Sequence, residues 1–246
     1  MNITSLDNKK IKKYYSLKNS KGRKKEGLFL IEGMHLCEEA YKVGILVDIL
    51  IEDNTVLSFK YDREITYVTG NILNKLSSLK NYSNVIGVCK IIEKNEIKGN
   101  KLLLLDDISD PGNIGTIIRS SKAFDIDTIV LSNNSVDIYN DKVLRSTEGM
   151  IFHMNIVYAN LYDTVLKLKE NNYLILGTDV KGGVDVRDVK TNKYALIMGN
   201  EGHGVSKELL KLTDKNLYIK MNPSCESLNV AVATSILLYE LRGNHE

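Results

Sequence analysis

Short apolar runs alternate with amphipathic stretches along the chain, and a polar stretch at residues 93–100 separates two such series. In the first series, apolar runs predict strands at residues 28–33, 47–52, 65–69 and 84–92. The longer patterns predict helices at residues 34–44 and 71–80. Because residues 93–100 carry no apolar periodicity, they are the predicted domain boundary.

The second series contains stronger strands. Continuous apolar runs bounded by turn residues predict strands at residues 101–107, 128–132, 172–179, 194–199 and 217–221. Helix-like stretches fall between them, around residues 114–124, 140–148, 161–171, 206–213 and 228–242. Uninterrupted apolar strands separated by helices predict an α/β fold with a parallel sheet covered by helices on both faces. Ligands of such sheets bind at the loops that leave the carboxyl ends of the strands.

The first of three polar loops follows the strand predicted at residues 101–107. Residues 110–115 read Asp-Pro-Gly-Asn-Ile-Gly. Pro111 forces Asp110 into an extended conformation, and a Pro-Gly pair favours a turn. Asn113 stands at the expected N-cap of the next helix, and Arg119 follows about a turn and a half later.

Two further loops are also rich in Gly, Asn and Ser. Residues 199–204 read Gly-Asn-Glu-Gly-His-Gly, a composition that permits close approach of the backbone to a ligand, and Ser206 is an expected N-cap. Residues 222–227 read Asn-Pro-Ser-Cys-Glu-Ser and lead into a nearly all-apolar helix that we expect to be buried on most sides, either in the monomer or at a subunit interface. Each loop alone is explained as a turn, a connector or a helix cap. Three such loops that leave strands in the same direction favour a ligand-binding site. Glu201 and Asn229 are polar beside apolar elements, so we expect both to have hydrogen-bond partners.

Composition and missing motifs exclude several classes of protein. Hydrophobic residues make up 43% of the chain, enough for a buried core. No apolar run approaches the roughly 18 residues of a membrane span, and the N-terminal segment is too polar for a signal peptide, so we expect a cytoplasmic protein. The three cysteines and four histidines show no metal-ligand or disulfide spacing, so no metal site is predicted; His203 is expected to be a loop residue, with ligand contact as the alternative. The chain has no dinucleotide fingerprint, phosphate loop or nucleophile elbow.

The net charge of +2 conceals a basic segment near the N-terminus. Residues 9–25 carry nine lysines and arginines and no acidic residue, with Tyr14 and Tyr15 among them. The charge alone leaves two interpretations open: a solvated amphipathic helix followed by a flexible polar loop, or a surface that binds nucleic-acid phosphates. In the second interpretation the candidate RNA-binding residues are Lys9, Lys10, Lys12, Lys13, Lys21, Arg23, Lys24 and Lys25.

At the three polar loops the sequence resembles the SpoU/TrmH-type RNA 2′-O-methyltransferases of the SPOUT class. The residues that carry the resemblance are 110–124, 197–206 and 219–243, and residues 24–40 are similar to the start of an L30e-like substrate-binding domain. The resemblance implies that residues 100–246 form a parallel α/β domain with a C-terminal trefoil knot. It also implies a smaller α/β L30e-like domain at residues 1–95 that binds the RNA substrate.

The resemblance further implies a cofactor, a catalytic group and a partner subunit. S-adenosylmethionine is expected in the knot, held by Gly199, Glu201, Gly202, Ile219, Met221 and Leu228. The catalytic group is expected to be Asn113, Arg119, Ser227 and Asn229. Members of the family work as homodimers packed through this C-terminal domain, so Arg119 is expected to reach the site of the partner subunit.

The expected function is the S-adenosylmethionine-dependent 2′-O-methylation of a ribose in structured RNA, with ribosomal RNA favoured. The alternatives are a transfer-RNA substrate and a non-catalytic RNA-binding protein of the same fold. An unrelated small-molecule enzyme is disfavoured by the basic segment. Family accounts give the counterpart of Arg119 the role of a base. Because a guanidinium has no acceptor, we expect Arg119 to bind a phosphate or to stabilise the developing alkoxide.

Two segments depart from the pattern of the family. Asp125 stands where glycine is usual, and Asp tolerates left-handed backbone geometry better than most residues. Asp141 and Glu148 stand where a proline and a small residue are common. Neither departure involves a residue of the expected catalytic group.

Overall fold

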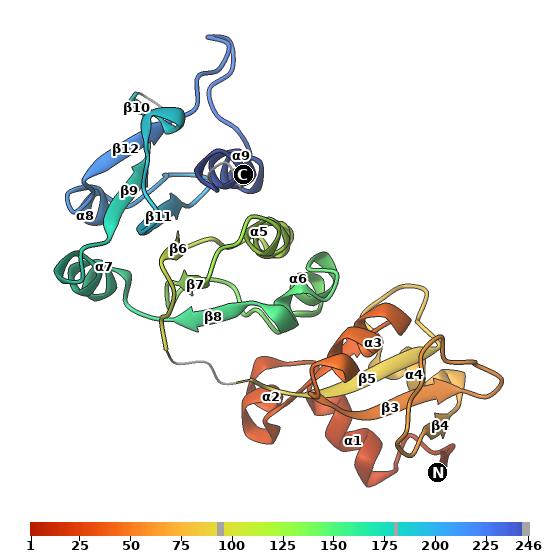
Figure 1. The fold of residues 1–246 in the computed structure, drawn as a ribbon. Coiled ribbons are helices and arrows are strands. Elements are labelled where there is room, and N and C mark those ends of the chain that lie inside the picture. Colours follow the sequence, from red (N-terminus) through yellow and green to blue (C-terminus); the bar gives the residue numbers. More distant parts are fainter. Residues whose placement is uncertain (93–95, 180–181, 243–246) are drawn as a thin grey trace. The chain divides into compact units, whose positions relative to one another are not determined.

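The computed structural model describes residues 1–92, 96–179 and 182–242. The chain divides into two compact units, and each unit has its own β-sheet (Figure 1). The first unit comprises Met1–Glu93 and Asp137–His153, and the second comprises Lys94–Val136 and Met154–Glu246. The contacts therefore assign the helix predicted around residues 140–148 to the first unit. The domain bounds 1–95 and 100–246 stay a prediction.

A five-stranded mixed sheet forms the centre of the first unit, in the order β1-β4-β3-β5-β2. Its strands are β1 (Asn2–Ile3), β2 (Leu28–Glu32), β3 (Leu46–Glu52), β4 (Thr66–Val68) and β5 (Val85–Lys90). Strands β2 and β3 are antiparallel to β5, whereas β1 and β3 run parallel to β4. The helices are α1 (Lys9–Ser16), α2 (Ser20–Glu26), α3 (Met34–Lys42), α4 (Gly70–Leu76), α6 (Asp141–Ser146) and the 3-10 helix η1 (Met150–His153). All strands predicted before residue 93 are confirmed.

Helix α1 is anchored in the first unit by a buried polar network around Asp48, which is 7% exposed. The Tyr14 hydroxyl donates to Asp48 Oδ2 at 2.7 Å, and the Thr66 hydroxyl donates to Asp48 Oδ1 at 3.0 Å. The Lys10 ammonium lies 2.8 Å from the same carboxylate. Burial and the neighbouring carboxylate raise the pKa of Tyr14 far above its usual value, so its hydroxyl stays protonated. A carboxylate inside a protein requires such partners.

The basic segment is more ordered than expected. Its second half was expected to be a flexible loop under the solvated interpretation, but residues 20–26 form α2, which Asn19 caps and Gly27 ends in a left-handed conformation. Arg23 is only 8% exposed and donates to Leu17 O at 3.0 Å and to Asp137 Oδ2 at 2.6 Å. Lys10 and Arg23 therefore stabilise the first unit itself, whereas the other candidate cations lie on its surface.

A seven-stranded sheet forms the centre of the second unit, in the order β10-β12-β9-β11-β6-β7-β8. Its strands are β6 (Lys101–Asp106), β7 (Thr128–Leu131), β8 (Asn155–Tyr158), β9 (Leu174–Thr178), β10 (Val184–Asp185), β11 (Tyr194–Gly199) and β12 (Lys215–Tyr218). Every pair of neighbouring strands runs parallel. The predicted parallel sheet is confirmed.

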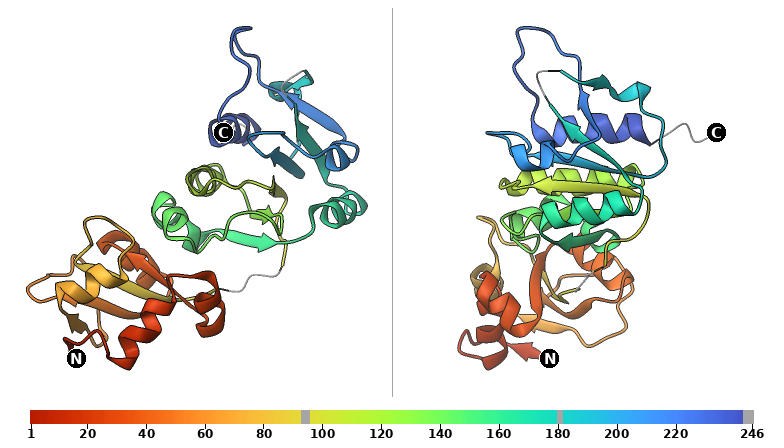
Figure 2. Two further views of the ribbon diagram at one scale, coloured as in Figure 1. Left: turned by 180° about the vertical axis from the view of Figure 1, so that it is seen from behind. Right: turned by 90° about the vertical axis from the view of Figure 1, so that its left-hand side faces the viewer.

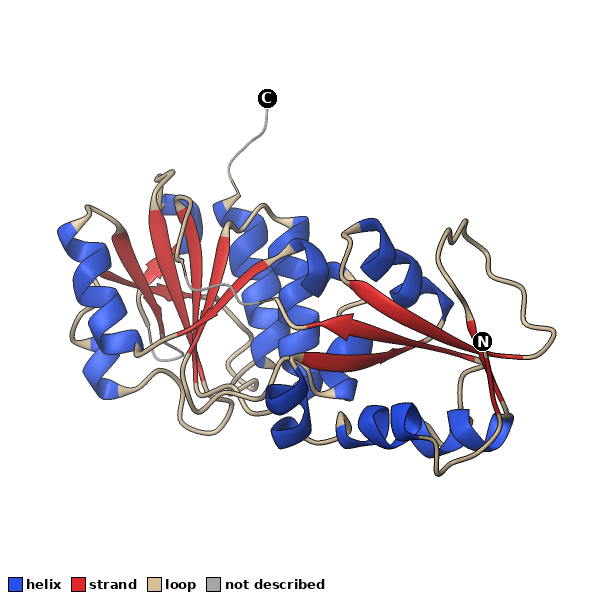
Figure 3. Ribbon diagram, turned by 90° about the horizontal axis from the view of Figure 1, so that it is seen from below, coloured by secondary structure: helices blue, strands red, loops and turns tan. Residues whose placement is uncertain are grey.

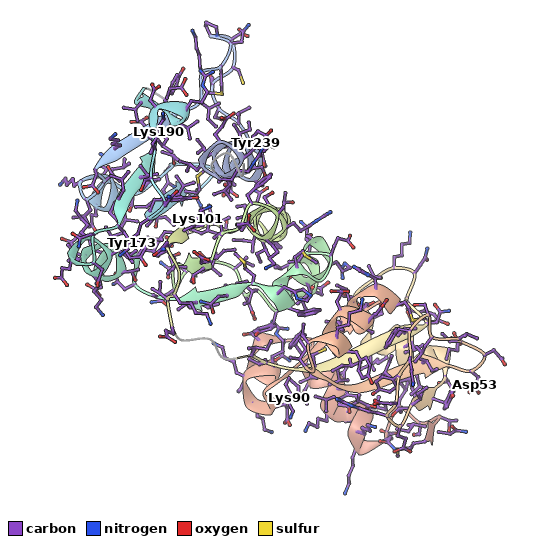
Figure 4. All side chains as sticks on the ribbon, viewed as in Figure 1. Asp53, Lys90, Lys101, Tyr173, Lys190 and Tyr239 are labelled. Carbon is purple, nitrogen blue, oxygen red and sulfur yellow. The ribbon has the colours of Figure 1, made fainter. Side chains whose placement is uncertain are left out.

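Helices cover both faces of this sheet (Figure 3). On one face, α7 (Leu161–Glu170) and α8 (Lys207–Leu210) pack on alternate residues of the central strands, such as Leu102 and Leu104. On the other face lie α5 (Pro111–Ala123) and α9 (Val230–Leu241), with the 3-10 helix η2 (Val186–Asp188) against α9 (Figure 1). A contact of 2.7 Å between the Ser120 and Ser235 hydroxyls joins α5 to α9. The ring of Tyr239, which Figure 4 labels, also contacts the ring of Phe124 at the end of α5.

Short edge elements escaped the sequence pattern. Strands β1 and β10 have two residues each, too few to produce a clear period, and the edge strand β8 was also not predicted. Strand β12 ends at Tyr218, so Ile219 and Met221 lie in the loop that follows rather than in the strand. Asp125 adopts φ of +57°, which agrees with the left-handed turn expected there. Among the described residues, no helix has the length and apolar character needed to cross a membrane.

The Asp48 network predicts different costs for two neighbouring tyrosines. Tyr14→Phe removes a hydrogen bond to a buried carboxylate and should lower the free energy of unfolding by about 1–3 kcal/mol. Tyr15 is 45% exposed, and Tyr15→Phe should change the stability by less than about 0.5 kcal/mol. Urea unfolding followed by circular dichroism measures both. Equal losses in the two variants would contradict the anchoring role of Tyr14.

Candidate functional site

The three polar loops of the second unit open at the same edge of its sheet. They follow β6, β11 and β12, which run parallel; β6 is next to β11, and β9 separates β11 from β12. Carboxyl ends of parallel strands meet at one edge, where ligands of such folds bind. The third loop runs out from the sheet and returns to α9 (Figure 2).

Asn113 lies inside the first turn of α5 rather than at its N-cap. The helix begins at Pro111, and Asp110 caps it by accepting a hydrogen bond from the Asn113 backbone N–H at 2.9 Å. The predicted N-cap at Asn113 was therefore wrong, because proline at the first helical position favours an earlier start. This start leaves the Asn113 side chain available to the other loops.

The side-chain amide of Asn113 connects all three loops. Its Nδ2 donates to Glu201 Oε1 at 2.6 Å, and its Oδ1 accepts from Asn229 Nδ2 at 3.0 Å. Asn229 is the N-cap of α9, and its Oδ1 accepts from the backbone N–H groups of Ala231 and Val232 at 2.9 and 3.3 Å. A carboxylate only accepts and a backbone N–H only donates, so this chain fixes the orientation of both amides. The partners expected for Glu201 and Asn229 are confirmed.

The connected side chains offer defined chemistry to a ligand. An amide nitrogen carries two N–H groups, and the chain uses one from Asn113 and one from Asn229. Glu201 contributes a carboxylate that lies at the surface. Amide donors beside a carboxylate acceptor suit the binding of hydroxyl groups, which both donate and accept.

A cavity of about 630 Å³ lies between the second and third loops. Its size is typical of small-molecule sites, which span roughly 300–1,000 Å³. The cavity brings together seven residues predicted from sequence: Gly199, Glu201, Gly202, Ile219, Met221, Ser227 and Leu228. Asn113 and Asn229 do not line it, but they reach it through their hydrogen-bonded chain to Glu201.

Sequence reasoning missed several residues of the cavity. Thr178 ends β9 and Asp179 follows it, and Tyr218 ends β12. The predicted parallel sheet could have indicated these residues, because the carboxyl ends of β9 and β12 lie at the same edge of the sheet as the carboxyl end of β11. Lys207 also lines the cavity, as does His203, for which the sequence left ligand contact as the alternative. In the part of the chain that the structure describes, no group of three His, Cys, Asp or Glu side chains could hold a metal ion.

Arg119 does not join the other expected catalytic residues within one subunit. It is exposed on α5, and its side chain forms no hydrogen bond or ion pair with any described residue. Helix α9, which we expect to be buried in the monomer or at a subunit interface, leaves one face exposed within a single subunit. Val232, Ile236 and Tyr239 are 48%, 37% and 51% exposed, and their spacing makes an apolar stripe along the helix.

Comparisons with protein families assign both parts of the chain. Residues 100–239 match the profile of the SpoU rRNA Methylase family, and residues 8–87 match the MRM3-like substrate binding domain. The first match covers more than half of the chain and includes all three polar loops.

Several known proteins resemble the whole chain. The 23S rRNA (guanosine(2553)-2′-O)-methyltransferase RlmP of Bacillus subtilis (strain 168) is 38% identical over 98% of this chain and 99% of its own. An AdoMet-bound rRNA methyltransferase structure from Sinorhizobium meliloti has a TM-score of 0.85 and 26% identity, covering 98% of this chain and 96% of its own.

A TrmH-family structure from Porphyromonas gingivalis has a TM-score of 0.86 and 27% identity and covers 96% of this chain and 98% of its own. These similarities confirm the α/β fold with a smaller N-terminal part, whereas the trefoil knot stays a prediction. They also confirm the resemblance found in the sequence. The chain belongs to the SpoU rRNA methylase family of RNA methyltransferases.

Proposed function

We propose that this protein transfers a methyl group from S-adenosylmethionine to the 2′-hydroxyl of a ribose in ribosomal RNA. The observation that carries the proposal is the hydrogen-bonded chain from Asn229 through Asn113 to Glu201 at the wall of a cavity of ligand size. The methyltransferases similar to this chain support the reaction, and the full-length similarity to a 23S rRNA enzyme favours ribosomal over transfer RNA. The expected cytoplasmic location follows from this substrate and is part of the proposal.

The cavity fits S-adenosylmethionine in size and in the chemistry of its walls. The backbone folds back so closely at Gly199 that a Cβ there would lie 2.0 Å from Gly204 C and from Val205 N. This loop and the segment after β12, with Ile219, Met221 and Leu228, offer backbone groups and apolar surface to a nucleoside and a methionyl chain. Bound there, the cofactor supplies a methyl group on a positively charged sulfur.

The residues around the cavity have the task of orienting the ribose. Methyl transfer requires the attacking oxygen in line with the sulfur–methyl bond, and such positioning supplies up to about 7–11 kcal/mol in favourable systems. The fixed amides of Asn113 and Asn229 donate to ribose oxygens, and Ser227 adds a hydroxyl at the cavity. An exposed Arg119 of the partner subunit binds a phosphate or stabilises the developing alkoxide, because a guanidinium cannot accept a proton.

The first unit supplies the cations for the RNA backbone. Lys9, Lys21 and Lys24 are exposed and form no ion pair with the described residues. Lys12, Lys13 and Lys25 are also exposed, beside acidic partners. Lys10 and Arg23 have internal partners, so the proposal assigns the RNA contact to the other six of the eight candidate cations. Clustered surface cations bind RNA by releasing counterions.

A homodimer through the second unit accounts for the outer face of α9. The stripe of Val232, Ile236 and Tyr239 exposes large apolar side chains on a helix that packs against α5, the helix that carries Arg119. Burying this stripe against a second copy removes apolar surface from water. It also brings Arg119 close to a neighbouring subunit, where a lone guanidinium can serve the partner's site.

The activity test uses labelled S-adenosylmethionine and total RNA from cells that lack the protein. The wild-type protein should label ribosomal RNA, and the product should resist alkaline cleavage at one site, because a methylated 2′-oxygen cannot attack its phosphate. Asn113→Ala should lower kcat by about 100-fold, since it removes a positioned donor. The matched control Asn171→Ala, at the end of α7, should retain full activity. Labelling of transfer RNA alone, or of no RNA, would contradict the proposal.

Two glycines of the second loop provide a test of the cofactor site. Gly199→Ala forces a Cβ into backbone atoms and should cost about 1–3 kcal/mol of stability. It should also weaken the binding of S-adenosylhomocysteine at least tenfold. At Gly202 the nearest atom to a Cβ is Asn200 Oδ1 at 3.3 Å, so Gly202→Ala should cost less than about 1 kcal/mol. Thermal unfolding and calorimetry measure both. Equal losses of stability and of ligand affinity in the two variants would contradict the tight backbone packing at Gly199.

The dimer is tested by charging the apolar stripe. Ile236→Glu should turn the dimer into a monomer, because the carboxylate would be buried at the interface without a partner. Leu166→Glu on α7 is the matched control, since Leu166 is 38% exposed on the opposite face of the sheet. Sedimentation velocity reports the mass of each. A monomeric wild-type protein at micromolar concentration, or a dimeric Ile236→Glu variant, would exclude this interface.

A further inference from the structure

Asn200 is held by three hydrogen bonds in the loop that carries Glu201. Its side-chain Nδ2 donates to the backbone carbonyl of Asp107 at 2.8 Å. Its side-chain Oδ1 accepts from the Gly202 N–H at 2.8 Å, and its backbone carbonyl accepts from the Gly204 N–H at 2.8 Å. Two of these bonds lie within the second loop and stabilise its turn. The third joins the loop to Asp107, the residue that follows β6.

Asp107, which receives this bond, has an unusual backbone conformation. Its φ is +55°, a region that costs energy for residues other than glycine. Ser132 supports it: the Ser132 hydroxyl donates to Asp107 Oδ1 at 2.6 Å and accepts from the Asp107 N–H at 3.0 Å. Ser132 is only 8% exposed at the end of β7. A fixed anchor therefore stands at the point where β6 passes into the loop before Asn113.

A further hydrogen bond connects the segment after the second loop to the end of β6. The Ser206 N–H donates to Asp106 Oδ2 at 2.8 Å, which fixes the far end of the loop where α8 begins. Glu201 is adjacent to Asn200, and its carboxylate has to meet an amide on a different loop at 2.6 Å. A small shift of the loop would break this bond, because hydrogen bonds weaken steeply with distance and angle.

We propose that Asn200 is a positioning residue, which holds the loop against Asp107 and thereby aims Glu201 at Asn113. The proposal rests on the proposed function of the site, and no catalytic contact is assigned to Asn200 itself. An asparagine suits the position because its amide both donates to the Asp107 carbonyl and accepts from the Gly202 N–H. Aspartate lacks the donor, and alanine lacks both groups.

The test is a double-mutant cycle with Asn200→Ala and Glu201→Gln, measured as kcat/KM for methyl transfer. If Asn200 acts through Glu201, Asn200→Ala should lower kcat/KM at least tenfold in the wild-type background and less than twofold in the Glu201→Gln background. Asn200→Asp should be as damaging as Asn200→Ala, because both lose the donor to Asp107. The control Asn171→Ala should leave kcat/KM unchanged in both backgrounds.

Hydrogen exchange provides a readout that needs no activity. The Gly202 and Gly204 amides should exchange at least tenfold faster in Asn200→Ala, while the central strands β6 and β11 keep their protection. A protein that transfers no methyl group would refute the proposed function, yet this measurement would still test the role of Asn200. Unchanged exchange at Gly202 and Gly204, or an equal loss of kcat/KM in both backgrounds, would overturn the inference. Global unfolding is checked by circular dichroism, and Asn200→Asp serves if the alanine variant does not fold.

Discussion

The arrangement of the site depends on one side-chain amide that holds three loops in place. Asn113 accepts from Asn229 at 3.0 Å and donates to Glu201 at 2.6 Å, so the loops after β6, β11 and β12 are bound to a single group. A carboxylate at one end and helix N–H groups at the other permit only one direction of donation along this chain. The orientation of both amides is therefore determined before any ligand binds, and such prior ordering favours catalysis.

The parallel sheet makes this convergence possible. Strands β6 and β11 are neighbours, and their loops leave at the same edge together with the loop after β12. Two further hydrogen bonds, accepted by Asp106 and Asp107 where β6 ends, hold the second loop in place. The first unit has a different task. The partly buried Lys10 and the buried Arg23 stabilise the unit, and exposed lysines remain on its surface.

The sequence predicted the strong strands, the parallel sheet and the loops of the site, because apolar runs and Gly-Asn-Ser loops leave local signals. It did not predict the end of a helix where two residues both suit the N-cap position. Asp110 replaced Asn113 as the N-cap because Pro111 suits the first helical position. The structural role of Arg23 was also not predicted. A run of basic residues does not reveal which of them pairs with Asp137, 114 residues away. The cavity residue Asp179 needed the order of the strands, a tertiary property.

The central claim is that the cavity between the second and third loops holds the methyl donor beside the Asn113 amide. A crystal structure of the protein with S-adenosylhomocysteine tests it most directly. The account predicts electron density for the ligand against Gly199, Met221 and Leu228, with the sulfur facing the side of the cavity where Glu201 meets Asn113. Density for the ligand at any other place, with this cavity empty at saturating concentration, would contradict the account.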